Sequence, residues 1–221
     1  MSQLFFDFYQ THKIDNFKEE DFLHFAENQN ACALLDNFFA DFFDNKFFKN
    51  LIIFGESCVG KTHLLNIYAN KFQLEIISLS QLNDIQPLDY FHQKQIYILD
   101  DLSLFQDENK ILQIINCASE VNAGLILIYR KFENYQTPDL NSRIQNMLSV
   151  NIENYSPAHL KIIFANILAR KQIYLNQKLL DLIFKKTIAT APDIVFMAKK
   201  VEEIFNISGK KPSADDFNFI F

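Results

Sequence analysis

The chain has 221 residues, 49% of them hydrophobic, and carries a formal net charge of -6. A chain of this length can bury one compact core, with room for a small appended domain. The acidic balance argues against a dedicated duplex-DNA binder, because such proteins usually present a basic face to the phosphates. A protein partner is the better expectation.

The cysteines and histidines do not have the spacing of a metal site. Cys32, Cys58 and Cys117 lie far apart without a CxxC pair, and the histidines lack HxxxH or HExxH spacing. This predicts a reducing cytosol and no cage of protein ligands around a metal. No apolar run reaches the roughly 20 residues that a membrane-spanning helix needs. We therefore expect a cytoplasmic protein without a membrane partner.

After a short N-terminal arm, hydrophobic periodicity predicts helices that alternate with strands. Helices are predicted at residues 28–43, 61–72, 109–121 and 138–147, with Asn28 as the N-cap of the first. Strands are predicted at residues 51–54, 74–79, 95–100, 125–129 and 149–152. This alternation indicates an α/β fold with a parallel sheet covered on both faces, in which ligands bind at the carboxyl ends of the strands.

From Ser156 onward the periodicity is purely helical. Ser156 and Pro157 form a cap and first-turn pair. Helices are predicted at residues 157–170, 177–187 and 192–205, with a last turn at 214–221. We therefore divide the chain into an arm (1–13), an α/β domain (14–155) and a small helical lid domain (156–221).

The octet GESCVGKT, from Gly55 to Thr62, matches the phosphate-loop pattern GxxxxGK[ST]. Glycines allow backbone N–H groups to surround phosphates, Lys61 reaches the outer phosphates, and the Thr62 hydroxyl binds Mg²⁺. A glycine turn with a surface lysine is the alternative, but the strand before and the helix after the octet favour a phosphate loop. The predicted nucleotide contacts are Gly55, Ser57, Cys58, Val59, Gly60, Lys61, Thr62 and His63.

Two acids follow the predicted strand at residues 95–100. Asp100 is placed to hold Mg²⁺ together with Thr62, and Asp101 to orient an attacking water. Adjacent acids after a strand are often only a solvated loop. At this distance from a phosphate loop, however, they favour the second half of an ATP site.

Three segments resemble a known family. GKTHLL after the phosphate loop, ILDDL at the acids and TPDLNSR at residues 137–143 are similar to the AAA+ module of the DnaA-related replication proteins, and most of all to the Hda type. The resemblance covers nearly the whole chain and implies an AAA+ P-loop NTPase fold. It also implies that Arg143 is an arginine finger that reaches the nucleotide of a neighbouring molecule, with DnaA as partner and self-association left open. From local sequence alone, a surface salt bridge is the better interpretation of Arg143.

The arm sequence QLFFDF resembles the peptides with which bacterial proteins dock on the sliding clamp, the β subunit of DNA polymerase III. The resemblance assigns clamp binding to Gln3, Leu4, Phe6 and Phe8. A flexible arm with a polar anchor and aromatic side chains suits a hydrophobic groove. The alternative is an N-terminal strand that packs on the protein's own core.

The chain also departs from this family. Where relatives end the fourth strand with a small polar residue, this chain has Ile128, Tyr129 and Arg130. Asp193 lies about where relatives place a lid arginine, and Lys199 or Lys200 follows one to two helical turns later. These differences predict weak or no intrinsic ATPase activity. We also expect no helix-turn-helix domain and little room for a DNA-gripping insertion, hence no direct sequence-specific DNA binding.

Together these features predict an Hda-like regulator that binds ADP or ATP with Mg²⁺, docks on the clamp and promotes ATP hydrolysis by DnaA. Three alternatives stay open: a nucleotide-bound clamp adaptor without a catalytic role, an AAA+ helicase loader, and an independent ATPase motor. If replacing Arg143 removes the effect on DnaA, the protein is the Hda-like regulator; if the replacement has no effect, the adaptor is favoured. Helicase binding without clamp binding selects the loader.

Overall fold

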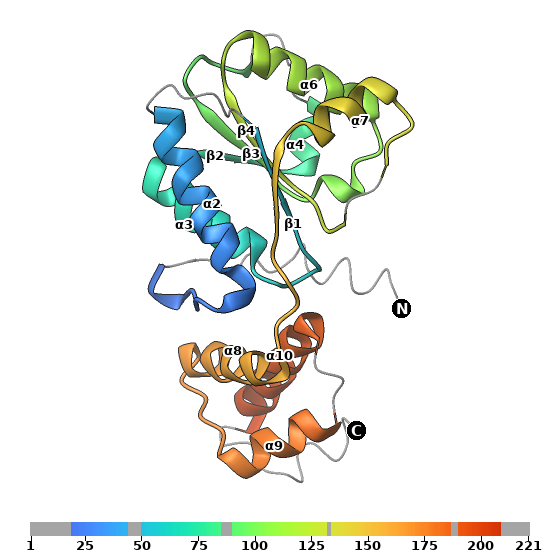
Figure 1. Ribbon diagram of the computed structural model, residues 1–221. Coiled ribbons are helices and arrows are strands. Elements are labelled where there is room, and N and C mark those ends of the chain that lie inside the picture. Colours follow the sequence, from blue (N-terminus) through green and yellow to red (C-terminus); the bar gives the residue numbers. More distant parts are fainter. Residues whose placement is uncertain (1–18, 44–49, 85–89, 132–133, 187–189, 209–221) are drawn as a thin grey trace.

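The computed structural model describes residues 19–43, 50–84, 90–131, 134–186 and 190–208 (Figure 1). The predicted clamp-binding residues and the predicted last turn at residues 214–221 lie outside these ranges. Within them, a sheet with helices on both sides forms one part of the molecule, and the helices that follow its last strand form the other.

The sheet has five strands in the order β2-β3-β4-β1-β5, and every pair is parallel. Its strands are β1 (Asn50–Phe54), β2 (Glu75–Ile77), β3 (Ile96–Leu99), β4 (Gly124–Ile128) and β5 (Leu148–Asn151). All residues of β3 and β4 are buried, as expected of central strands covered on both faces, whereas half-buried residues alternate with exposed ones in the edge strand β5. The predicted α/β architecture is confirmed.

Successive residues of a strand point to opposite faces of the sheet, and this divides the core into two layers. Leu51 and Ile53 pack with α2 (Ala26–Phe43) and α3 (Lys61–Phe72). Ile52 faces the other way. On that face it packs in a layer with α4 (Leu79–Asp84), α6 (Glu108–Glu120) and α7 (Pro138–Gln145), as Figure 1 shows.

Helices α8 (Pro157–Arg170), α9 (Gln177–Lys186) and α10 (Ala191–Ser208) pack around a hydrophobic cluster of their own. Phe164 of α8 is completely buried in this cluster. The Ser156 hydroxyl accepts a hydrogen bond from the backbone N–H of His159 at 3.3 Å, and Pro157 occupies the first turn. The predicted start of α8 is therefore confirmed.

The prediction of Asn28 as an N-cap is wrong. Helix α2 begins at Ala26, and Asn28 is fully buried inside its first turn. Its side-chain oxygen accepts a hydrogen bond from the Phe25 N–H at 3.0 Å, while its amide nitrogen donates to the Leu23 carbonyl at 2.8 Å and to the Tyr155 hydroxyl at 3.1 Å. Asn28 therefore binds the residues just before the helix from within its first turn, and it also contacts Tyr155, which is distant in the sequence.

The predicted strand at residues 74–79 is too long. Strand β2 ends at Ile77, and Leu79 begins the short helix α4, which the periodicity did not indicate. The side-chain oxygen of Gln81 accepts hydrogen bonds from both the N–H and the hydroxyl of Ser78, at 2.9 and 2.7 Å. This local capping ends the strand.

Candidate functional site

The predicted site residues meet at one edge of the sheet. Because the strands are parallel, their carboxyl ends lie side by side, with β1 between β4 and β5. The phosphate loop follows β1, the two acids follow β3, and Arg130 lies two residues after the end of β4. The segment that leads to the lid continues from β5 at the same edge.

The phosphate loop depends on its two glycines. Gly55 has φ +153°, and a Cβ atom there would lie 2.9 Å from both the Ile152 carbonyl oxygen and Val59 Cγ2. Gly60 has φ +95°, a conformation that L side chains rarely adopt. Cys58 takes a left-handed φ of 65° even though it is not glycine. A larger residue at either glycine would therefore distort the loop.

Lys61 turns its ammonium group into the loop. The residue is only 8% exposed, and its Nζ donates hydrogen bonds to the carbonyl oxygens of Gly55 and Glu56 at 2.5 and 2.8 Å. Burial lowers the pKa of Lys61, while the carboxylates of Asp101 and Asp100 oppose this shift. A bound phosphate would offer the ammonium anionic oxygens in place of the two carbonyls.

Thr62 and Asp100 form an oxygen-rich pair next to Lys61. The Thr62 hydroxyl donates to Asp100 Oδ2 at 3.3 Å. Burial raises the pKa of Asp100, Asp101 adds to this shift, and the Thr62 hydrogen bond and Lys61 reduce it. In the described part of the chain, no group of three His, Cys, Asp or Glu side chains could hold a metal ion. A hydroxyl and one carboxylate suit Mg²⁺ when substrate phosphates and water complete its shell, so this pair fits Mg²⁺ together with a nucleotide.

Asp101 is engaged by an arginine that the sequence reading did not connect with it. Arg130 Nε donates to both carboxylate oxygens of Asp101 at 3.1 Å, and Arg130 Nη2 donates to Oδ2 at 2.5 Å. The contact requires β3 and β4 to be neighbours, which the linear spacing of 29 residues does not reveal.

Residues before α2 and after β5 pack against the phosphate loop. The Tyr155 hydroxyl, which accepts from Asn28, donates to the Val59 carbonyl at 2.9 Å. The rings of Phe22 and His63 meet edge to face, with centroids 5.3 Å apart. The sequence analysis assigned no function to Phe22 or Tyr155, whose role depends on contacts across the fold.

Polar contacts also join this N-terminal segment to the lid. The Glu27 carboxylate accepts a hydrogen bond from the Ser156 N–H at 3.0 Å and contacts His159 Nδ1 at 2.8 Å. Asp21 forms an ion pair with Arg170 at 3.0 Å. The lid is therefore attached close to the phosphate loop.

Helix α10 brings a lysine toward the phosphate loop. Burial lowers the pKa of Lys199, and a charge interaction with Cys58 of the loop opposes that shift. Asp193, by contrast, caps the start of its own helix: its carboxylate accepts hydrogen bonds from the N–H and hydroxyl of Thr190 at 3.0 and 2.6 Å.

Arg143 lies on α7, which covers the opposite face of the sheet from α3 (Figure 1). Its Nε is 3.4 Å from Asp139 Oδ2, one helical turn away, and 40% of the Arg143 side chain is exposed. Glu108 fixes the start of α7, because its carboxylate accepts hydrogen bonds from the N–H groups of Gln136 and Thr137, both at 2.8 Å. The structure does not place Arg143 among the side chains around Lys61.

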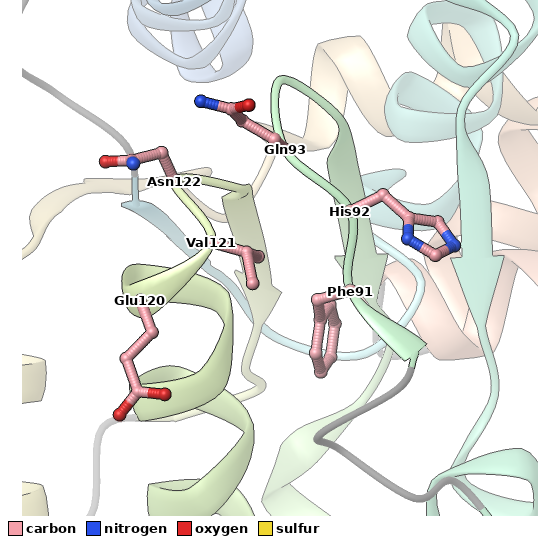
Figure 2. A pocket seen from close by; sticks show the side chains of 6 residues that line it. All are labelled: Phe91, His92, Gln93, Glu120, Val121 and Asn122. Atoms are coloured by element: carbon pink, nitrogen blue, oxygen red, sulfur yellow. The ribbon is translucent and has the colours of Figure 1, made fainter.

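A separate surface hollow lies at the other end of the sheet. Figure 2 shows its lining on two segments, Phe91 to Gln93 before β3 and Glu120 to Asn122 at the end of α6, before β4. These segments precede their strands, so the hollow lies opposite the edge that carries the phosphate loop. It contains none of the predicted site residues.

No protein-family model matches the sequence, and no curated protein matches it significantly. Solved structures do match the chain. Domain III of the replication initiation protein DnaA from Thermotoga maritima aligns over 93% of this chain and 95% of its own, with a TM-score of 0.73 and 18% identity. The fold is that of an AAA+ P-loop NTPase. The RuvB Holliday junction branch migration motor of Thermotoga maritima aligns over 91% of this chain and 70% of its own, with a TM-score of 0.66 and 14% identity.

AMPPCP-bound DnaA from Aquifex aeolicus aligns over 89% of this chain and 67% of its own, with a TM-score of 0.65 and 17% identity. At these identities the likeness establishes the AAA+ fold. Among the described residues, no helix is long and apolar enough to cross a membrane.

Proposed function

We propose that this chain is an Hda-like AAA+ regulator of replication initiation. It binds an adenine nucleotide with Mg²⁺ at the phosphate loop and uses Arg143 to promote ATP hydrolysis by DnaA. The proposal depends above all on the meeting of buried Lys61, Thr62 and Asp100 at one edge of an AAA+ sheet. The similarity to DnaA, including an AMPPCP-bound form, supports adenine as the base and replication as the process.

Docking on the sliding clamp completes the proposal. Gln3, Leu4, Phe6 and Phe8 supply the docking peptide, which lies outside the described residues. Replacing Gln3, Phe6 and Phe8 together with alanine should abolish co-elution with the β subunit and leave the melting temperature unchanged. Continued co-elution would place the contact elsewhere in the protein.

Nucleotide binding is the first test. Calorimetric titration with ADP and Mg²⁺ should show binding to the wild type and none to Lys61→Ala. Lys71→Ala is the matched control, because Lys71 lies at the exposed end of the same helix. ADP should also raise the melting temperature, since it binds only the folded chain. Absence of wild-type binding at millimolar ADP would refute the proposed function.

We further propose that ADP binds at least as tightly as ATP. ADP retains the loop N–H groups, Lys61 and the metal, whereas the terminal phosphate of ATP lacks a lid arginine as partner, because Asp193 stands at about that place in the sequence and caps its own helix. Parallel titrations compare the two dissociation constants. A strong preference for ATP would favour an independent motor.

The role of Arg143 is tested on a partner. The ADP-bound protein and the clamp are mixed with ATP-loaded DnaA, and phosphate release is followed. Arg143→Ala should remove the stimulation without weakening clamp binding, because a flexible cation acting on another molecule's nucleotide makes no contribution to docking on the clamp. Stimulation that is unchanged in Arg143→Ala would favour the adaptor function instead.

A further inference from the structure

Asp101 and Arg130 form a bidentate ion pair at the edge of the sheet that carries the phosphate loop. We propose that Arg130 is a positioning residue that withholds Asp101 from catalysis and so restrains ATP hydrolysis at this chain's own site. This inference rests on the proposed nucleotide binding, and it assigns a cause to slow turnover. The arginine engages both oxygens of the carboxylate, at distances of 2.5 to 3.1 Å.

Both partners are fixed by the backbone around them. Asp101 has a left-handed φ of 54° and precedes the short helix η2 (Leu102–Leu104). The Arg130 N–H donates to the hydroxyl of Ser103, within that helix, at 2.7 Å. The backbone at Arg130 is therefore held to the short helix after Asp101 by the Ser103 hydroxyl, in addition to the ion pair, and this limits the directions in which either side chain can turn.

The pair also lies on the phosphate side of the sheet edge. Burial lowers the pKa of Lys61, the Asp101 carboxylate opposes that shift, and the Arg130 guanidinium adds to it, so both members of the pair act on the charge of Lys61. The side chains of Arg130 and Asp101 are 39% and 29% exposed, so solvent reaches them. Asp101 directly follows Asp100, which accepts a hydrogen bond from Thr62, and its own carboxylate is already engaged by Arg130.

Hydrolysis requires the carboxylate to be available. A water oxygen forms a bond to the terminal phosphorus of ATP, and the bond from that phosphorus to the bridging oxygen breaks, so that ADP leaves with the electron pair. One water proton passes through the Asp101 carboxylate to solvent or to the released phosphate. The guanidinium engages both oxygens of Asp101 and holds the carboxylate toward Arg130, so the carboxylate is not free to turn toward the attacking water and orient it.

Replacing Arg130 should therefore accelerate hydrolysis. In Arg130→Gln, the rate of single-turnover ATP hydrolysis should rise by about 10- to 100-fold, where 100-fold is about the smallest rate enhancement that a positioned base usually contributes. The dissociation constant for ATP should change by less than about threefold (under about 0.7 kcal/mol). Arg130→Lys keeps the charge but not the planar fork, and its rate should lie between those of the wild type and Arg130→Gln. The double variant Arg130→Gln/Asp101→Asn should return to the slow wild-type rate, because the gain depends on the freed carboxylate.

The outcomes separate this inference from the proposed function. ATP and ADP binding are titrated first, and melting in the absence of nucleotide confirms folding. If the wild type binds no nucleotide, both proposals are refuted. If the wild type and Arg130→Gln both bind nucleotide but Arg130→Gln hydrolyses ATP no faster than the wild type, only the restraint by Arg130 is refuted. The same conclusion follows if the double variant stays fast. If Arg130→Gln does not fold, Arg130→Lys decides by the same criterion: a rate no higher than wild type refutes the restraint.

Discussion

The sheet region and the lid are stabilised in different ways. The sheet is covered by two layers of apolar side chains, one on each face, whereas the lid helices share a single cluster around Phe164. Between them, polar contacts join Glu27 to Ser156 and His159 and Asp21 to Arg170, and the rings of Phe25 and His159 stack with centroids 4.2 Å apart. Units that are packed around separate clusters can change relative to one another without either unit unfolding. The phosphate loop lies where the two units meet, so a nucleotide can affect both.

The largest expected effect comes from removing the centre of the lid cluster. Phe164→Ala should cost about 3–5 kcal/mol of lid stability, because it leaves a cavity in a fully buried site. Circular dichroism during thermal unfolding should then show an early helical transition while the sheet region melts near its original temperature. Ile162→Ala, at a half-exposed position of the same helix, is the control and should stay within about 0.5 kcal/mol. A single transition shifted as a whole would show that the two regions unfold together.

The second effect concerns the buried amide of Asn28, which supports Tyr155 beside the phosphate loop. Asn28→Ala leaves the Phe25 N–H and the Leu23 carbonyl without this partner and should cost about 1–3 kcal/mol in the free energy of unfolding, measured by denaturant titration. ADP affinity should fall as well, because Tyr155 loses the donor that orients it toward Val59. Asn37→Ala, at an exposed position of the same helix, should change neither quantity appreciably. Unaltered ADP affinity in Asn28→Ala would show that Tyr155 needs no such support.

A smaller effect, which depends on pH, is expected at Glu27. Burial opposes ionisation of this carboxyl, but hydrogen bonds from the Ser156 N–H, its own N–H and His159 outweigh it, so the pKa of Glu27 lies below its ordinary value of 4.5. The stabilisation is therefore fully present above the unfolded-state pKa and is lost as the pH falls through the folded-state pKa.

Glu27→Gln should accordingly cost about 1 kcal/mol at neutral pH, since the neutral amide accepts weaker hydrogen bonds than a carboxylate does. The difference from wild type should shrink in acid, as shown by denaturant midpoints measured across the acid range. The exposed Glu153→Gln is the control. A difference that grows in acid would contradict the sign of the shift.

The smallest effect is expected at the ion pair on α7. Asp139→Ala removes the partner of Arg143 at 3.4 Å, on a solvent-exposed helix surface, and should change stability by less than about 0.5 kcal/mol. Stimulation of ATP hydrolysis by DnaA should persist in this variant, in contrast to Arg143→Ala. Loss of stimulation in Asp139→Ala would mean that the pair itself orients the arginine.

Local signals predicted much of this structure. Helix α3 begins and ends where the phosphate-loop pattern and the apolar periodicity placed it, and α8 starts at the predicted cap Ser156. The strands were found because continuous apolar runs are typical of central parallel strands, with errors of one or two residues at their ends. Short helix α4 was missed because side-chain capping by Gln81, and not apolar periodicity, defines it.

The errors within the site have a common physical cause. Asn28 was placed at a helix end because its residue type favours caps, but its partner Tyr155 is 127 positions away. The ion pair of Asp101 and Arg130 likewise depends on which strands are neighbours. Local sequence patterns identify residues that can bind phosphate, but they do not show which of these side chains already form hydrogen bonds or ion pairs with each other. Such contacts decide whether a site can react.

The parallel pairing of β1 has a consequence for how the chain is made. Asn50 lies opposite Leu125, and Leu51 lies opposite Leu148. At synthesis rates of about 5–20 residues per second, a ribosome needs about 5–20 seconds to pass from β1 to β5. The apolar side chains of β1 lack both neighbouring strands until β4 is made, and they lack one of them until β5 follows. The phosphate loop lacks the segment after β5 that supports it for the whole interval. The nascent chain is therefore exposed to chaperones and proteases before it can recruit a nucleotide, and ligand binding can protect it only after that segment has been made.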